Sequence, residues 1–272
     1  MAASFRRTMR AGIAFAFAVA IVAGAAYAYR EFAASGYFAL RNVELSGDLR
    51  APRRELISSL YASTSTGLWQ ADLDQLREKL RTHPWVRDAE VIRVLPDTLR
   101  VKISEREPYA LARLERGTLV WVDRDGVILD EQGSFKGAAD IDKGLPLISG
   151  LKEKGALARE ANRQQMLVYE RLIDELRAGE PPLLDRIEEA HFDDVEGVQL
   201  QLAGKGVRVI AGTEDFHGQV KKALAVIDAV AQRDLATLEL FRVTDAEQLF
   251  GGRAISYINT KSPTHIIIGL AR

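Results

Sequence analysis

The sequence predicts an α+β protein with a single N-terminal transmembrane helix, a small module of βααββ order, and then a β-rich domain with two or more helices. Three patterns predict this class. An uncharged run occupies residues 11–29, strand and helix signals alternate over residues 38–107, and short strand-like segments separated by turn residues fill residues 108–272. A chain of 272 residues is long enough for two domains with their own cores.

The first 30 residues predict a membrane anchor. Three arginines lie within residues 6–10, and the run 11–29 that follows contains no charged residue. At about 1.5 Å per residue, a helix of this length nearly matches the roughly 30 Å hydrocarbon layer of a bilayer. The basic residues favour a cytoplasmic tail at residues 1–10. A cleaved signal peptide ending at Ala26-Tyr27-Ala28 is the alternative, and both interpretations export the rest of the chain.

The predicted module, residues 38–107, follows a linker at residues 30–37. Its first strand lies within residues 37–47, where apolar and polar residues alternate. A first helix begins near Pro52, because a helix tolerates proline in its first turn. We expect this helix and a second one to cover one face of a three-stranded sheet and to close a small core.

The second helix of the module is predicted from its cap and its apolar face. It begins at Asp72, a favourable N-cap residue, and Pro84 ends it. Leu73, Leu76 and Leu80 share one face of this helix. We therefore expect that face to pack on the sheet.

A β-hairpin is predicted to complete the module. Residues 86–95 are strand-like, and apolar and polar residues alternate strictly in residues 99–104. The tetrapeptide Leu95-Pro96-Asp97-Thr98 between them is a turn sequence, because proline presets the backbone of a turn. A lone hairpin is barely stable in water, so the two helices must cover its apolar face.

The β-rich domain, residues 108–272, is predicted from short strands with turn residues between them. We expect strands at 109–115, 118–122, 127–129, 187–192, 198–202, 207–210, 238–243, 254–258 and 265–270. One helix is expected to end at Gly179, and another is expected to follow Thr213. Residues 131–146 are predicted to form a loop.

No motif predicts a catalytic residue, a cofactor, a metal site or a small-molecule substrate. The spacing Ser149-x-x-Lys152 matches the penicillin-binding serine enzymes, but Gly150 indicates a loop where that chemistry needs the start of a helix. The four histidines lie far apart, without the spacing of a zinc motif. The chain has no cysteine, which excludes disulfides and thiolate catalysis. Its 37 basic and 38 acidic residues argue against a nucleic-acid-binding protein.

Three segments carry a resemblance to a known family. They read L.NV.L.G at residues 40–47, HPWV..A.V.R..P.TL.V.I.EREP.A at 83–110, and VD.DGV at 122–127. Together with the basic N-terminus and the single anchor, they resemble the POTRA domain and its continuation in the FtsQ/DivIB family of bacterial cell-division proteins. POTRA modules also precede outer-membrane barrels, but the roughly 160 residues after Pro108 are too few for the strands of such proteins.

The resemblance implies a non-enzymatic, single-pass scaffold of the divisome. Its implied partners are FtsB and FtsL with other divisome proteins, through which it would link early and late division proteins and control septal peptidoglycan synthesis. The implied location is the inner (cytoplasmic) membrane at the division septum, with type II topology and the C-terminal bulk in the periplasm. The alternatives are an envelope enzyme or ligand-binding protein that carries a POTRA-like module, or a POTRA-containing outer-membrane assembly factor.

The final strand pair, 254–259 and 265–270, is the predicted partner site. The sequence stops two residues after the last strand, so we expect an uncovered edge, which invites a strand from another chain. This segment also resembles the one that contacts FtsB in the family, and its lysine would suit an acidic partner residue. The predicted partner-binding residues are Tyr257, Lys261, Thr264, Ile266, Ile267, Ile268 and Gly269. Ser262 and Leu270 stand where some family members carry aromatic anchors, and an edge blunted by Pro263 is the alternative.

Overall fold

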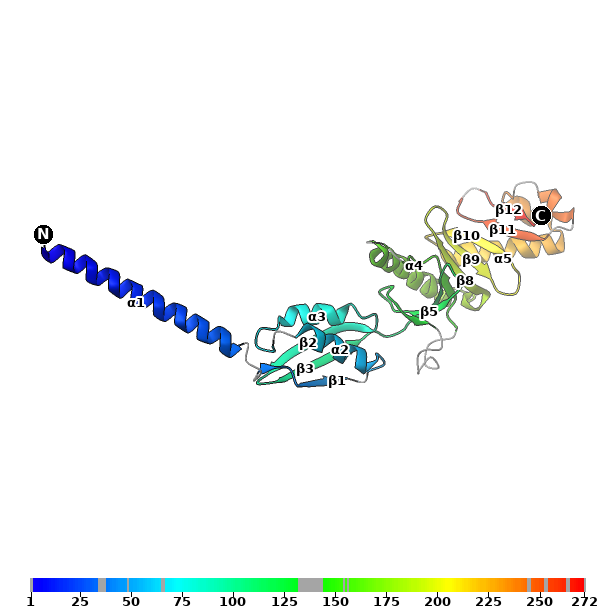
Figure 1. Ribbon diagram of the computed structural model, residues 1–272. Helices are drawn as coiled ribbons and strands as arrows, with labels where there is room; N and C mark the ends of the chain where they lie inside the picture. Colours follow the sequence, from blue (N-terminus) through cyan, green and yellow to red (C-terminus); the bar gives the residue numbers. More distant parts are fainter. Residues whose placement is uncertain are drawn as a thin grey trace. The chain divides into compact units, whose positions relative to one another are not determined.

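A computed structural model describes most of the chain in two compact units, Met1–Arg106 and Glu107–Arg272. The elements of both units are labelled in Figure 1. The described residues are 2–33, 38–47, 49–64, 67–131, 144–153, 155, 157–243, 246–251, 254–262 and 265–271.

The first unit begins with a long helix, α1 (Ala2–Ala33) (Figure 1). The side chains described in it, from residue 15 to residue 30, are exposed. The helix extends beyond the segment 11–29 at both ends, because alanine, arginine and methionine favour helix and no proline interrupts them. Within the part of the chain that the structure describes, no helix is long and apolar enough to cross a membrane.

The remainder of the first unit is a three-stranded sheet with two helices. Its elements are β1 (Asn42–Ser46), α2 (Arg53–Ser63), α3 (Leu73–Arg81), β2 (Val86–Val94) and β3 (Thr98–Glu105). The central strand is β3, which pairs with β1 in parallel and with β2 in antiparallel register. The predicted βααββ order and the predicted hairpin are therefore confirmed.

The helix cap and the burial pattern of this module agree with the sequence. The Asp72 carboxylate accepts hydrogen bonds from two backbone N–H groups in the first turn of α3, which stabilises the start of the helix. Leu76 and Leu80 are buried, while Leu73 is half-buried. In β3 the apolar residues between 99 and 103 are buried and the residues between them are exposed. One face of the sheet therefore closes the core with the helices.

The second unit contains a nine-stranded sheet. Its strands are β4 (Ala110–Arg113), β5 (Leu119–Val122), β6 (Ile128–Glu131), β7 (Leu147–Ser149), β8 (Ile187–Asp193), β9 (Gly197–Leu202), β10 (Arg208–Gly212), β11 (Ile255–Asn259) and β12 (Ile267–Leu270). They lie in the order β12-β11-β10-β9-β8-β7-β4-β5-β6. The predicted β-rich fold is thus confirmed, and β12 is the strand at one end of the sheet.

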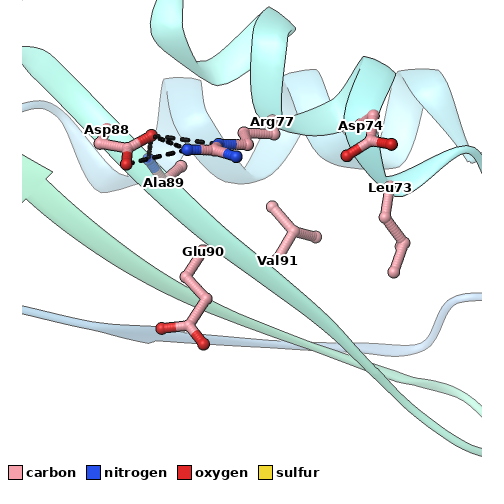
Figure 2. Close-up of a pocket in the computed structure, with 7 residues that line it drawn as sticks. All are labelled: Leu73, Asp74, Arg77, Asp88, Ala89, Glu90 and Val91. Carbon is pink, nitrogen blue, oxygen red and sulfur yellow. Dashed lines mark hydrogen bonds and ion pairs between the residues drawn. The ribbon is translucent and has the colours of Figure 1, made fainter.

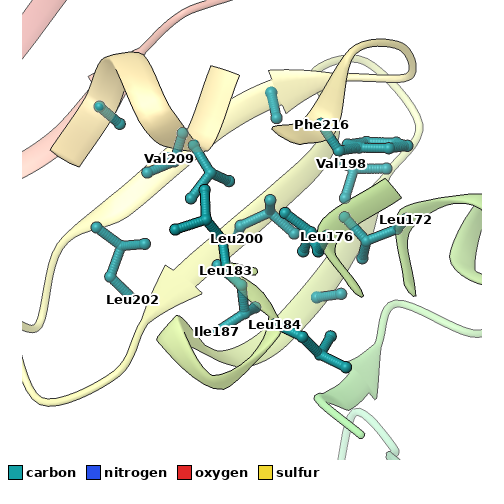
Figure 3. Packing of buried hydrophobic residues seen from close by; sticks show 14 of the residues in the cluster. Leu172, Leu176, Leu183, Leu184, Ile187, Val198, Leu200, Leu202, Val209 and Phe216 are labelled. Carbon is teal, nitrogen blue, oxygen red and sulfur yellow. The ribbon is translucent and has the colours of Figure 1, made fainter. Parts of the chain in front are cut away.

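Helices pack on this sheet and close its core. They are α4 (Ala158–Ala178), α5 (Phe216–Gln232), α6 (Leu235–Leu240), and the short 3-10 helices η3 (Leu184–Arg186) and η4 (Ala246–Gly251). Figure 3 shows Leu172 and Leu176 of α4 beside Phe216 of α5, against Val198 and Leu200 of β9. Burying these large apolar side chains is the main force that holds the helices on the sheet.

The strand expected at residues 238–243 is wrong, because residues 238–240 belong to helix α6 and residues 241–242 form a turn. Asp234 caps the helix: its carboxylate accepts hydrogen bonds from Thr237 N at 3.2 Å and from Thr237 Oγ1 at 2.6 Å. These bonds fix the first turn in a helical conformation. Val243 still forms an isolated parallel bridge to Ile266.

Strand β7, which was not predicted, joins two parts of the sheet. It pairs in parallel with β4 on one side and with β8 on the other. Ser149, expected in a loop, is its last residue. Gly150 follows with φ +86°, and a Cβ atom there would lie 2.1 Å from the carbonyl oxygen of Phe192. Only glycine permits this close approach of the two backbones.

Candidate partner-binding site

The hairpin β11–β12 forms one end of the nine-stranded sheet (Figure 1). Its antiparallel register places Tyr257 opposite Gly269 and Ile258 opposite Ile268. The other side of β11 pairs in parallel with β10, so the hairpin is continuous with the sheet. Among the described residues, no strand pairs with the outer side of β12. That side is therefore an edge on which another strand can form backbone hydrogen bonds.

The free edge begins at Ile267. The residue before it, Ile266, bridges to Val243 and is 4% exposed, so it belongs to the core of the unit. The Ile267 side chain is 40% exposed, whereas Ile268 packs partly against the core. This alternation anchors β12 by one side chain and leaves the next at the surface. Thr264 lies outside the described residues.

The Tyr257 ring lies against the backbone of β12 at Gly269. A Cβ atom on Gly269 would lie 2.0 Å from Tyr257 Cε1 and 2.4 Å from Cδ1, so any other residue here would displace the ring. Tyr257 remains 37% exposed. A partly exposed tyrosine offers both an apolar surface and a hydroxyl group, and tyrosine is enriched among residues that dominate protein interfaces.

The turn of the hairpin is fixed by Thr260, which the sequence did not single out. Thr260 is 4% exposed; its backbone N–H donates to Ile210 O at 3.1 Å, and its Oγ1 donates to Gln219 Oε1 of α5 at 2.9 Å. Lys261 follows at the surface, where its backbone N–H donates to Asn259 Oδ1 at 3.1 Å. The buried threonine thus holds the exposed lysine at the end of the hairpin.

Two basic residues lie at this end of the sheet. Arg208 of β10 is opposite Tyr257 in the parallel register and is exposed, and Lys261 follows β11. Arg208 Nη1 donates to the neutral Gln199 Oε1 at 3.3 Å. In the described part of the chain, neither basic side chain forms an ion pair with a carboxylate. This uncompensated positive charge suits an acidic partner segment.

A groove of about 370 Å³ lies between α3 and β2 in the first unit (Figure 2). It is lined by Leu73, Asp74, Arg77, Asp88, Ala89, Glu90 and Val91. Arg77 Nη2 lies 2.9 Å and 3.0 Å from the two carboxylate oxygens of Asp88. This hydrogen bonding lowers the pKa of Asp88 and raises the pKa of Arg77. Both groups therefore stay charged at neutral pH, which makes them unsuited to proton transfer.

Ser149 and Lys152 do not form a catalytic pair. Ser149 Oγ donates to Glu189 Oε1 at 2.6 Å and lies 2.9 Å from His191 Nδ1. Lys152 Nζ donates to Asp194 Oδ2 at 2.6 Å, and this hydrogen bond raises the pKa of the lysine. A protonated lysine cannot take the serine proton. The serine also bridges the acid and the histidine, whereas in a catalytic triad the histidine bridges the other two.

Both units match known families. A family model described as "POTRA domain, FtsQ-type" matches residues 38–106, and one described as "Cell division protein FtsQ/DivIB, C-terminal" matches residues 110–259. The second match ends with β11, before the turn and β12.

Individual relatives agree with these matches. The chain is 30% identical over 214 residues to the cell division protein FtsQ of Geotalea daltonii, covering 78% of this chain and 74% of that protein. It is 28% identical over 204 residues to the cell division protein FtsQ of Syntrophotalea carbinolica, covering 74% and 70%. For the cell division protein FtsQ of Myxococcus fulvus the identity is 31% over 209 residues, covering 73% and 67%. The chain therefore belongs to the FtsQ/DivIB family of cell division proteins.

Proposed function

We propose that this protein is a non-enzymatic, single-pass membrane scaffold of the divisome that captures a partner chain at the hairpin β11–β12. The observation that carries the proposal is the edge of β12, with the Tyr257 ring against Gly269. Arg208 lies opposite Tyr257, and Lys261 follows β11 at the surface. Family membership supports the role in cell division. The Arg77–Asp88 ion pair in the groove between α3 and β2 supports a scaffold over an enzyme.

The proposed partner at this edge is FtsB, and FtsL is reached through it. An extended or turn-forming segment of FtsB adds to β12 as a further strand and forms backbone hydrogen bonds with alternate residues of the stretch 267–269. An acidic residue of that segment pairs with Lys261. The proposed partner-binding residues remain Tyr257, Lys261, Thr264, Ile266, Ile267, Ile268 and Gly269, with Ile266 supporting the edge from the core. Through FtsB and FtsL, the protein controls septal peptidoglycan synthesis.

Residues 11–29 of helix α1 are the proposed membrane anchor, although the side chains described in α1 cover only residues 15–30, fewer than the roughly 20 residues that a membrane span needs. Residues 11–29 carry no charge, and the apolar side chains described in the helix are exposed, among them Phe15, Val22 and Tyr27. A helix that is apolar on all sides is stable where its surroundings are apolar, as in a protein core or a bilayer. The arginines before the run place residues 1–10 in the cytoplasm and the C-terminal bulk in the periplasm, at the septum.

The anchor is tested by the N-terminus of the mature protein. If residues 11–29 remain in the membrane, sequencing of the membrane-extracted protein starts at residue 1 or 2. A sequence that starts near Tyr29 instead identifies a cleaved signal peptide.

We also propose domain boundaries at 38–107 for the POTRA domain and 108–272 for the β domain.

The partner site is tested by affinity purification of the tagged full chain from growing cells, with co-purifying chains identified by mass spectrometry. Lys261→Glu should lower recovery of FtsB and FtsL, because it reverses the charge that faces the partner. Lys102→Glu is the matched control, since Lys102 is exposed on β3 of the first unit and is not part of the hairpin. A chain that lacks residues 264–272 should lose capture with the POTRA domain still folded. Full capture of FtsB and FtsL by the shortened chain would show that the partner site lies elsewhere.

A further inference from the structure

Three exposed side chains form an apolar surface on the first unit, which we name the Trp69 surface. It consists of Tyr61, Trp69 and Leu95, whose exposed fractions are 40%, 36% and 47%. The other two tryptophans of the chain, Trp85 and Trp121, are buried at 5% and 4%. Trp69 is thus the tryptophan that the fold leaves at the surface, beside an exposed tyrosine and leucine.

A ring contact and two hydrogen bonds place these residues at one end of the module. The Phe38 and Trp69 rings lie 5.4 Å apart between centroids. The Tyr61 hydroxyl donates to Arg41 O at 2.8 Å. The backbone N–H of Arg41 donates at 2.9 Å to Asp97 O, in the hairpin turn that also contains the exposed leucine. All three side chains therefore surround the point at which the chain enters the module.

This end of the module is close to helix α1 along the chain. The helix ends at Ala33, and Phe38 follows five residues later. Five residues span at most about 18 Å, since an extended chain advances by about 3.3–3.6 Å per residue. The first unit also contains a direct contact, in which Trp69 Nε1 donates to Tyr29 Oη at 2.8 Å. Tyr29 is the last residue of the uncharged run.

The chemistry of the Trp69 surface fits the boundary between lipid and water. Tryptophan and tyrosine are enriched at this boundary, because each combines a large apolar ring with a polar group that stays hydrated. Arg41 is exposed at the same end, where its charge suits the phosphate of a lipid head group.

We infer that the Trp69 surface docks on the outer leaflet of the membrane at the lipid–water boundary, which rests on the proposed anchoring by α1. Docking restricts rotation of the POTRA domain about its anchor, because the module then has a second attachment beside the chain itself. The inference adds a membrane contact to a module whose other surfaces stay free for proteins.

Tryptophan fluorescence of the full chain in lipid vesicles tests this contact. The protein is reconstituted into phosphatidylethanolamine–phosphatidylglycerol vesicles, with or without brominated phospholipids that quench nearby indole rings. We expect brominated lipid to remove the Trp69 share of the emission. Trp69→Phe keeps an aromatic ring on Phe38 and should show no quenching, because the remaining Trp85 and Trp121 are buried.

A second reporter does not depend on replacing Trp69. The chain has no cysteine, so one introduced cysteine can be labelled with a fluorescent dye. Leu95→Cys places the dye on the Trp69 surface, and Arg87→Cys is the matched control near the other end of β2. Eight residues of strand separate them by about 26 Å, at about 3.3 Å per residue. Brominated lipid should quench the dye at residue 95 and spare the dye at residue 87.

Flotation of the vesicles separates the two proposals. If the chain does not float with the vesicles, the anchor is wrong and the docking inference falls with it. If the chain floats but wild-type emission is unquenched, the anchor stands and the docking is wrong. Equal quenching of wild type and Trp69→Phe, or of the two labelled positions, likewise overturns the docking.

Discussion

Replacing Leu76 by alanine should strongly destabilise the POTRA domain. Leu76 is 2% exposed on the inner face of α3, so the change removes buried methyl groups and leaves a cavity. Changes of this kind cost about 2–5 kcal/mol. At about 0.05–0.15 kcal/mol per residue, the free energy of unfolding of a module of this size is roughly 4–10 kcal/mol. The variant therefore loses from about a fifth to all of that free energy.

Leu73→Ala is the matched control for this prediction. It makes the same change on the same helix, but the Leu73 side chain is only half-buried. Urea unfolding of the full chain in detergent measures both, in a Trp121→Phe background that leaves only the tryptophans of the first unit as reporters. The urea midpoint should fall clearly further for Leu76→Ala. Equal shifts for the two variants would show that the inner face of α3 is placed wrongly.

Three further predictions concern the two units. Gly269→Ala should displace the tyrosine ring that rests on it and weaken partner capture, whereas Gly251→Ala, with open space around its Cβ, should not; the affinity purification above measures both. Arg77 lowers the pKa of Asp88 in the folded protein below the unfolded value of about 3.9. The stability that this ion pair adds is therefore complete at pH values above the unfolded pKa, and it is lost as the pH falls through the folded pKa. The difference in urea midpoint between wild type and Asp88→Asn should therefore shrink below about pH 4. Thr260→Val leaves a hydrogen-bond acceptor on α5 without its donor and should cost about 1 kcal/mol in urea unfolding, while Thr260→Ser should cost less.

Elements whose conformation depends on neighbouring residues could be predicted from the sequence. The alternation in β3 is visible in six consecutive residues, and the Asp72 cap lies within three residues of the groups that it binds. The hairpin β11–β12 was placed to within two residues for the same reason, since each strand is a short apolar run next to turn residues.

Elements that depend on distant partners could not be predicted in this way. Strand β7 has three residues and owes its conformation to β4 and β8 on either side. Residues 238–243 alternate between apolar and polar residues at several positions, yet the cap at Asp234 decides in favour of helix α6. On α5 the buried face includes Ala223 and Ala229, which a search for large apolar residues overlooks.

The same distinction applies to the partner site. The two short apolar runs predict the last strand pair, but the contact of Tyr257 with Gly269 requires the cross-strand register. The attachment of Thr260 to α5 joins residues 41 positions apart. The burial of Ile266 depends on Val243, which lies in the segment with the wrong strand assignment.

The Leu76→Ala variant also tests whether the two units act independently. Among the described residues, the apolar core of the second unit is formed by residues between 109 and 270 and shares no buried side chain with the core around Leu76. A cavity at Leu76 should therefore leave the hairpin β11–β12 intact, and the anchored Leu76→Ala chain should still capture FtsB and FtsL. Conversely, Lys261→Glu should lower capture without shifting the unfolding of the POTRA domain. Loss of capture by Leu76→Ala at temperatures where the second unit remains folded would show that partner binding requires the first unit as well as the edge of β12.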